Sequence, residues 1–260
     1  MAIGLAQAAA AQPVVLYSAN FNSPTYADGP LVNPPSATDT TTPGQDGWLS
    51  TNAGLTNQIP VSNSATNGFV SLTTSGQDVR HQFTAVNSGS VFFDADVTVS
   101  AAQATGDYAL HLSDGGTSLF YARTYFQSSG TGFHMALGTS AGTTGLVYGP
   151  DLAFGTTYHV LARYDFVSGT GNNDTGALYI NPTTVDGSGD TPYVAATLEG
   201  TDATSIAAIA LRQGTAANSA TLTVDNYRAF VMPVPEPSSL ALLGIPGVAV
   251  VIRRFRRKAA

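Results

Sequence analysis

Val91-Phe92-Phe93-Asp94-Ala95-Asp96-Val97-Thr98-Val99 is a stretch in which apolar and polar side chains alternate. Successive side chains of a β-strand point to opposite faces, which places Phe93, Ala95 and Val97 on one face and Asp94 and Asp96 on the other. We therefore predict a long, half-buried strand, with its apolar face in a core and its carboxylates outside.

Short stretches of similar character recur on both sides of this strand, separated by turns rich in Gly, Ser, Asp and Asn. No convincing helix precedes the C-terminal tail, and no long repeat indicates a solenoid or propeller. We predict an all-β domain of two antiparallel sheets packed as a jelly-roll sandwich. The other expected strands are 14–21, 58–62, 68–73, 78–85, 108–112, 119–126, 132–137, 145–148, 156–166, 176–181, 205–213 and 220–231.

The composition indicates a hydroxyl-rich surface with few charges. Charged residues make up 10% of the 260-residue chain, against roughly 25% in ordinary soluble proteins. Sixteen acidic residues and five arginines precede Pro235, so the body carries a net charge of about −11, which argues against nucleic acid as a partner. Cysteine is absent, which excludes disulfides, thiolate nucleophiles and Cys-ligated metals.

The C-terminal residues combine three segments of different chemistry. Pro233, Pro235 and Pro237 each fix φ and lack a backbone donor, so this linker should be extended and solvated. Residues 240–252 are uncharged, although they are fewer than the roughly 20 that span a bilayer comfortably. A basic cluster then keeps this end cytoplasmic by the positive-inside rule, with the body outside. Its members are Arg253, Arg254, Arg256, Arg257 and Lys258.

We predict that 240–252 form a short transmembrane helix. The alternative is an ordinary C-terminal core helix, since apolar runs of 10–14 residues are often buried in soluble proteins. Pro246-Gly247 in the middle of the run argues against that alternative, as does the lack of an amphipathic face.

The order of Pro235-Glu236-Pro237, an apolar helix and an arginine cluster resembles the PEP-CTERM sorting tail of exported bacterial proteins. The resemblance implies export through the general secretion machinery and transient anchoring in the inner membrane. It also implies processing at the Pro-Glu-Pro site by an exosortase, a membrane-embedded transpeptidase-like protease. The protein is then expected at the cell surface or in the extracellular matrix.

Three parts of the chain are expected from these patterns. Residues 1–11 are interpreted as the remnant of a signal peptide, because small residues suited to cleavage end near Ala11. A charged start is missing, so we expect the natural chain to begin upstream. Residues 12–231 should form the sandwich, and 232–260 the sorting tail.

The expected sandwich also resembles a known group of domains. An N-terminal strand ends in Asn20-Phe21, a meander covers 108–181, and the closing strand contains Val224-Asp225-Asn226-Tyr227. This order of elements is similar to concanavalin A-like and laminin G-like domains.

Catalytic motifs are weak in the body of the chain. No Gly-x-Ser-x-Gly elbow occurs, and the four histidines lack metal-ligand spacing. Asp94 and Asp96 share a strand face as a glycosidase pair would, but the Glu-based motif of related hydrolases is absent. We predict a non-enzymatic domain with a structural or adhesive function, and keep a glycoside hydrolase as the less favoured alternative.

A carbohydrate-binding module for exopolysaccharide is a further alternative. Trp48, the only tryptophan, could stack on a sugar, although such a residue more often plugs the core at the rim of a sandwich. Strand alternation places His111 and His134 on a polar face with Tyr121 and Arg123. That face could bind glycan or could be an ordinary solvated surface. The candidate glycan-binding residues are Trp48, Tyr121, Arg123 and His134.

No cofactor is indicated by the sequence, and calcium is the one ion that we considered. Asp165, Asn172 and Asp174 surround a single loop, and extracellular jelly rolls without disulfides often gain rigidity from an oxygen-lined ion site. Their spacing fits no EF-hand, and Asn and Asp are also common turn residues. Both interpretations of this loop stay open at this point.

Overall fold

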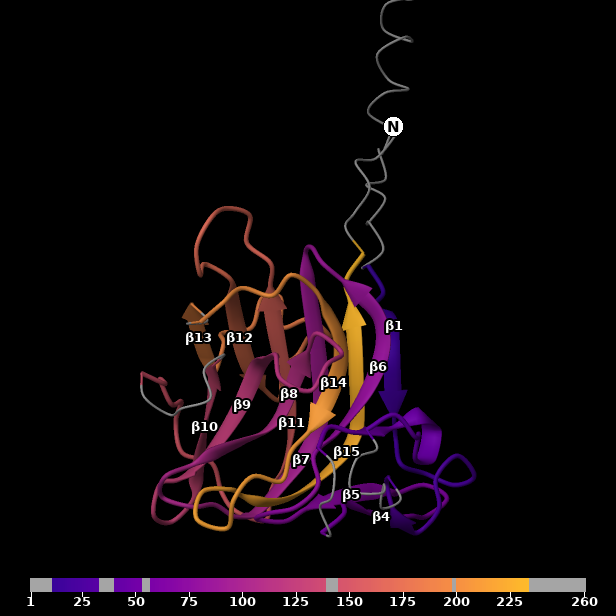
Figure 1. The fold of residues 1–260 in the computed structure, drawn as a ribbon. Coiled ribbons are helices and arrows are strands. Elements are labelled where there is room, and N and C mark those ends of the chain that lie inside the picture. The colour runs from indigo at the N-terminus through magenta and orange to yellow at the C-terminus, as the bar shows by residue number, and fades with distance from the viewer. Residues whose placement is uncertain (1–10, 33–39, 53–56, 139–144, 198–199, 234–260) are drawn as a thin grey trace, which may run out of the picture. The chain divides into compact units, whose positions relative to one another are not determined.

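Antiparallel strands make up nearly all the regular structure of the computed structural model, which describes residues 11–32, 40–52, 57–138, 145–197 and 200–233 (Figure 1). The helical structure in these residues is one 3-10 turn, η1 (Gln45–Gly47). Two packed sheets confirm the predicted all-β sandwich. None of the described helical structure could cross a bilayer, and the transmembrane helix predicted over 240–252 lies outside the described residues.

The larger sheet contains nine strands and is centred on β7 and β15. Its order is β13-β12-β11-β7-β15-β5-β4-β2, and β1 pairs with β15 beside this path. The last strand of the body therefore contacts the first, with Val14 opposite Val231. The bounds are β1 (Val14–Ala19), β2 (Gly29–Pro30), β4 (Pro60–Ser62), β5 (Phe69–Leu72), β7 (Ser90–Ala101), β11 (Thr157–Asp165), β12 (Thr175–Ile180), β13 (Val194–Thr197) and β15 (Thr221–Val231).

The smaller sheet contains six strands in the order β10-β9-β8-β14-β6-β3. It packs face to face with the larger sheet (Figure 1). Its bounds are β3 (Leu49–Ser50), β6 (Val79–Val86), β8 (Asp107–Ser113), β9 (Phe120–Ser128), β10 (Phe133–Gly138) and β14 (Ile206–Leu211).

The core lies between the sheets and follows the alternation seen in the sequence. On β7, Phe93, Ala95 and Val99 have no exposed surface and belong to the main hydrophobic cluster. Trp48 is also completely buried, with its ring 6.4 Å from that of Tyr227. Trp48 therefore fills part of the core, and its ring is not accessible to a sugar. The prediction that it could bind glycan is wrong.

A bulge in β15 determines which side chains of this strand face the core and which face outward. The register between β15 and β7 shifts between Asp225 and Arg228, and Asn226 adopts a φ of 49° there. The extra residue turns Tyr227 into the core, where its hydroxyl donates to the carbonyl of Ala210 at 3.1 Å. Tyr227 thus links the two sheets by a hydrogen bond as well as by packing.

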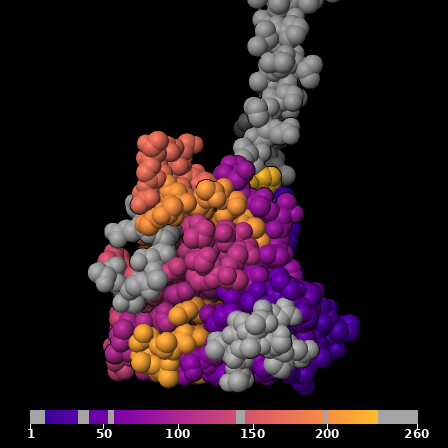
Figure 2. Space-filling view, in the orientation of Figure 1, coloured from indigo at the N-terminus to yellow at the C-terminus, as the bar shows by residue number. Residues whose placement is uncertain are grey.

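Four short segments differ from the sequence expectation. The predicted strand at 145–148 contributes only an isolated bridge between Tyr148 and Ala136. Conversely, β2, β3 and β13 were not expected, because segments of two to four residues have too little periodicity to be recognised. Of the described residues between β1 and β3, those coloured indigo lie together at the lower right corner of the sandwich in the space-filling view (Figure 2).

We expect Tyr227→Phe to lower the free energy of unfolding by about 1 kcal/mol, the usual net contribution of a hydrogen bond. Tyr158→Phe is the matched control, because its hydroxyl accepts a 3.0 Å bond from the Ala153 N–H at an exposed site. This control should change stability by less than about 0.5 kcal/mol. Chemical denaturation measures both values, and equal losses would contradict a special contribution of Tyr227.

Candidate functional site

The outer face of the smaller sheet carries aromatic rings packed around arginine and histidine side chains. The guanidinium carbon of Arg123 lies 4.8 Å from the centre of the Tyr108 ring, and that of Arg212 lies 4.2 Å from it. Contacts of this kind between a cation and an aromatic face are attractive. The His111 ring lies 4.7 Å from that of Phe120. We call the whole set the basic-aromatic cluster: Tyr108, His111, Phe120, Arg123, Tyr125, Tyr148 and Arg212.

Several polar atoms of this cluster are buried without a hydrogen-bond partner. They are both ring nitrogens of His111, Nε and Nη1 of Arg123, and the hydroxyl of Tyr148. His111 is 1% exposed and Arg123 is 7% exposed. Buried polar groups in folded proteins are nearly always paired, so several exceptions on one face require a physical reason. A ligand that supplies the missing partners would be such a reason.

Burial and charge set the protonation of the cluster. Desolvation, followed by the charges of Arg123 and Arg212, holds the pKa of His111 well below its usual value, so this imidazole is neutral. Burial raises the pKa of Tyr148 to about 12. Burial also raises the pKa of Tyr125, with the neighbouring Arg123 opposing the shift. The cluster thus combines a cation, a neutral imidazole and protonated phenols.

An acidic pair on one side of the cluster binds Arg212. Its Nη1 lies 2.7 Å from Oδ2 of Asp107, and its Nε lies 3.8 Å from Oδ2 of Asp78. Burial raises the pKa of Asp78 to about 7, with Arg212 acting against the shift. Arg123 has no carboxylate partner among the described residues, so its positive charge is the one left unbalanced here.

A bulge in β9 separates two residues that the sequence placed together. Ala122 has a φ of 45°, and the register with β8 shifts so that Leu112 faces Tyr121 and Leu110 faces Thr124. Tyr121 consequently points into the core, where its ring lies 5.8 Å from that of Tyr164. Alternation alone had predicted a common face for Tyr121 and Arg123, and the inserted residue makes that placement wrong.

His134 stays on the outer face, at the edge of the basic-aromatic cluster. Its Nε2 lies 2.8 Å from Oε1 of Gln127, and its ring lies 4.4 Å from that of Tyr148. Of the four candidate glycan-binding residues, only Arg123 and His134 therefore lie on this outer face. Sequence analysis missed the tyrosines of the cluster, although the position of Tyr108 on the same strand as His111 was a signal that could have indicated one of them.

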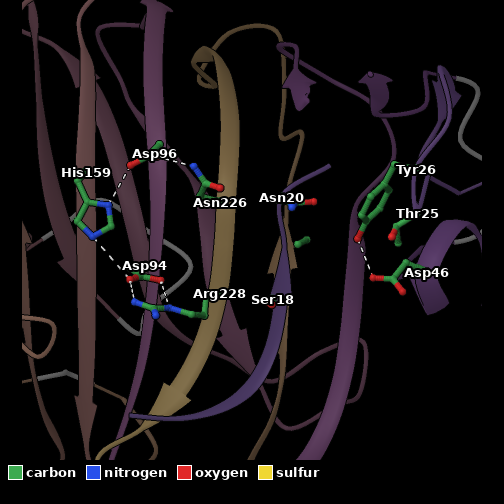
Figure 3. Close-up of a pocket in the computed structure, with 11 residues that line it drawn as sticks. Ser18, Asn20, Thr25, Tyr26, Asp46, Asp94, Asp96, His159, Asn226 and Arg228 are labelled. Atoms are coloured by element: carbon green, nitrogen blue, oxygen red, sulfur yellow. Dashed lines mark hydrogen bonds and ion pairs between the residues drawn. The ribbon is translucent and has the colours of Figure 1, made fainter. Parts of the chain in front are cut away.

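A cavity of about 590 Å³ lies on the outer face of the larger sheet. Figure 3 shows His159 beside Asp94 and Asp96, with Arg228 and Asn226 next to these carboxylates and Tyr26 and Asp46 across from them. We call it the polar pocket, lined by Ser18, Ala19, Asn20, Thr25, Tyr26, Asp46, Asp94, Asp96, His159, Asn226 and Arg228.

The carboxylates of the polar pocket are fixed by basic and amide groups. Arg228 binds Asp94 through both carboxylate oxygens, with Nε at 3.0 Å from Oδ1. Nδ1 of His159 lies 2.9 Å from Oδ1 of Asp96, and the amide of Asn226 donates to Oδ2 of Asp96 at 2.8 Å. Asp94 and Asp96 thus share a face as expected, and Arg228 contacts both carboxylate oxygens of Asp94.

The loop considered for calcium has internal partners for its carboxylates. Asp165 forms an ion pair with Arg163 at 2.9 Å. Asp174 is buried and accepts hydrogen bonds from the Tyr164 hydroxyl and the Val167 N–H. Asn172 is exposed. Across the described part of the chain, no group of three or more His, Asp and Glu side chains is placed to hold a metal ion.

Comparison with known families concerns the C-terminal residues. Residues 233–258 match the family model of the PEP-CTERM protein-sorting motif. The chain carries a PEP-CTERM sorting motif. This confirms the resemblance stated for the tail, and the motif implies an exported protein that is sorted at the membrane. No curated protein matches the chain.

Solved structures resemble the sandwich. The alginate lyase Aly36B aligns over 84% of this chain and 98% of its own, with 17% identity and a TM-score of 0.52. A mutant of that lyase in complex with alginate tetrasaccharide gives the same coverage, with 17% identity and a TM-score of 0.51. An endo-β-1,4-glucuronan lyase from the fungus Trichoderma reesei covers 84% and 96%, at 9% identity and a TM-score of 0.43. At 17% identity the likeness to Aly36B shows the fold alone.

The prediction that the domain is not an enzyme was wrong. Alginate lyase is an enzyme built on this fold, so a sandwich of this kind accommodates polysaccharide cleavage. The reasoning had excluded catalysis because the hydrolase motif is missing, and that argument does not apply to a lyase. The fold therefore gives no ground for excluding an enzyme.

Asp78 provides a test of the electrostatics beside the basic-aromatic cluster. Its pKa is raised from 3.8 to about 7, so between these values the folded protein binds a proton that the unfolded chain has released. The free energy of unfolding should therefore fall as the pH rises from about 3.8 to about 7 through this group. Asp78→Asn should make this slope shallower in denaturation measured at successive pH values, and an unchanged slope would contradict the raised pKa.

Proposed function

We propose that the sandwich is an exported domain that binds an anionic polysaccharide at the basic-aromatic cluster. The observation that supports this most directly is the set of buried, unpaired polar atoms on His111, Arg123 and Tyr148. Groups of this kind cost free energy unless a partner supplies hydrogen bonds. A glycan that enters the cluster would provide the partners that the described residues lack.

The unbalanced charge of Arg123 favours an acidic sugar over a neutral one. A buried cation without a counter-charge is expensive, and a carboxylate is its best partner because the guanidinium can donate two parallel hydrogen bonds to it. The ring of Phe120, which is partly exposed and contacts Arg123, would pack against the apolar face of a sugar. A uronate-containing glycan satisfies both requirements.

The fold shared with Aly36B supports the same class of ligand. That protein is an alginate lyase, and its mutant was solved with alginate tetrasaccharide. Alginate is a polyanionic glycan, which fits the charge of Arg123. The body as a whole is acidic, so attraction for such a ligand must come from the cluster itself rather than from net charge.

Cleavage by β-elimination is the second candidate function, and the grouping of an imidazole, a phenol and a guanidinium with unpaired polar atoms in one cluster favours it. In this reaction a base removes the proton on the carbon next to the sugar carboxylate, and that electron pair forms a C=C bond. The bond from the adjacent carbon to the glycosidic oxygen breaks, and an acid protonates the leaving oxygen. In this cluster His111 would be the base, the Tyr148 hydroxyl the acid, and Arg123 the partner of the carboxylate.

The sorting motif supports a proposal about delivery. We propose that an exosortase-type protease processes the chain at Pro235-Glu236-Pro237 after export through the secretion machinery, while the apolar segment and the basic cluster hold it transiently in the inner membrane. The body is then released to the cell surface or the extracellular matrix, where acidic exopolysaccharide would be its ligand.

Arg123→Ala should weaken binding of a uronate oligosaccharide at least about tenfold, because a charge-assisted bidentate contact is lost. Calorimetric titration with tetrasaccharides of alginate and of glucuronan measures the affinity. Arg163→Ala is the matched control, since it removes the same charge from the larger sheet. If the domain also cleaves these chains, the ultraviolet absorbance of the new double bond should rise and His111→Ala should abolish the rise.

Two results would contradict the proposal that the basic-aromatic cluster binds a glycan. One is the absence of binding by either uronate, and the other is an equal loss of affinity in Arg163→Ala and Arg123→Ala. Thermal unfolding of each variant identifies any that fail to fold, and Arg123→Lys then tests the site with the charge retained.

Glu236→Ala should leave export intact but block processing, because the carboxylate at the centre of the sorting motif is lost. Cell fractionation with an antibody against the sandwich should find the unprocessed chain in the membrane fraction. Normal release of this variant would contradict recognition of Glu236.

A further inference from the structure

The polar pocket lies on the other sheet from the basic-aromatic cluster and has no part in the proposed function. We propose that it is a second glycan site, which binds a neutral sugar through its hydroxyl groups. Its volume of about 590 Å³ falls within the range of ~300–1,000 Å³ that is typical of small-ligand sites.

The polar side chains that line the pocket are held in place by contacts with one another. Asp94 is 2% exposed and is held by the bidentate contact with Arg228. Asp96 is held on one oxygen by His159 and on the other by Asn226. Across the cavity, Asp46 accepts a 2.8 Å hydrogen bond from the hydroxyl of Tyr26 (Figure 3). Fixed polar groups favour binding because little ordering remains to be done when the ligand docks.

Two of the residues that line the pocket have unusual backbone conformations. Asp46 and Asn226, with φ values of 50° and 49°, are two of the five non-glycine residues with positive φ in the described chain. Such conformations are sparsely populated and tend to occur where a ligand is bound. At Asn226 the cause is the bulge of β15, which aims its amide at Asp96.

The balance of donors and acceptors selects the class of sugar. Asp46, Asp94 and Asp96 face one permanent cation, Arg228, so an anionic glycan would be repelled. Each carboxylate oxygen can accept about two hydrogen bonds, which leaves capacity beyond the contacts already made. A sugar hydroxyl both donates and accepts, so it can use these oxygens together with the side chains of Asn20, Thr25 and His159.

The wild-type protein allows a test that depends on no substitution. The four histidines of the chain are His81, His111, His134 and His159, and only His159 lines the polar pocket. Titration with neutral tetrasaccharides of glucose, mannose, galactose and xylose should shift the ring signals of His159 in heteronuclear NMR spectra. The ring signals of His111 and His134 should stay in place. A uronate tetrasaccharide should instead shift the ring signals of His111 and His134 and leave those of His159 in place.

Variants then assign the contact to the pocket. Asp96→Ala and Asn226→Gly should each weaken binding of the neutral sugar at least about tenfold, the effect of losing hydrogen bonds to a charged or fixed group. Glycine is chosen at 226 because it keeps the positive φ without strain. Thr157→Ala, on the same face but outside the pocket, is the matched control and should bind normally.

Three outcomes would overturn the second site. They are no response of His159 to any neutral sugar, retained affinity in Asp96→Ala, and loss of neutral-sugar binding in Arg123→Ala. The last result would assign the sugar to the basic-aromatic cluster instead. Failure of uronate binding alone would leave this inference intact, so the two proposals are tested separately.

Discussion

Strand β15 is the element on which the larger sheet depends, because it pairs with β7 on one side and with β1 and β5 on the other. Its bulge sends Tyr227 inward and Arg228 outward. The inward side chain joins the two sheets, while the outward one neutralises the buried carboxylate of Asp94. A single irregularity in the last strand therefore stabilises the core and shapes the polar pocket at the same time.

The two outer faces of the sandwich have opposite chemistry. On the smaller sheet, aromatic rings shield a cation that lacks a counter-charge, whereas on the larger sheet carboxylates outnumber the arginine that they contact. In a chain with a strongly acidic body, a buried cation attracts a nearby anion more strongly than an exposed one does, because water and salt screen it less. Arg123, which is 7% exposed, is placed in this way.

Alternation in the sequence was enough to predict the longer strands and the class of fold, because side-chain direction in a regular strand depends only on local position. The apolar face of β7 was predicted residue by residue for this reason. Where a bulge inserts a residue, as at Ala122, every side chain beyond it changes face and the prediction fails. Trp48 was left open between core and surface, because its burial depends on contacts with distant residues such as Tyr227.

The sites were harder to foresee than the fold. Asp94 and Asp96 of the polar pocket were recognised from their spacing, but their partners come from β11 and β15, which lie far away in the sequence. The lack of partners for the ring nitrogens of His111 and for Nε and Nη1 of Arg123 is likewise a property of packing, which no local pattern records. Residue types thus indicated where polar groups gather, while their protonation and pairing required the assembled sheets.

The place of β15 in the sheet also has a consequence for timing. In a chain that emerges from its N-terminus, β15 is the last strand of the body to appear, and until then β7 lacks one neighbour and β1 and β5 lack a partner in the larger sheet. Only three residues separate Val231 from Pro235, so the strand that completes this sheet leads directly into the sorting motif. The larger sheet can therefore be completed only after nearly the whole body, up to the start of that motif, has emerged.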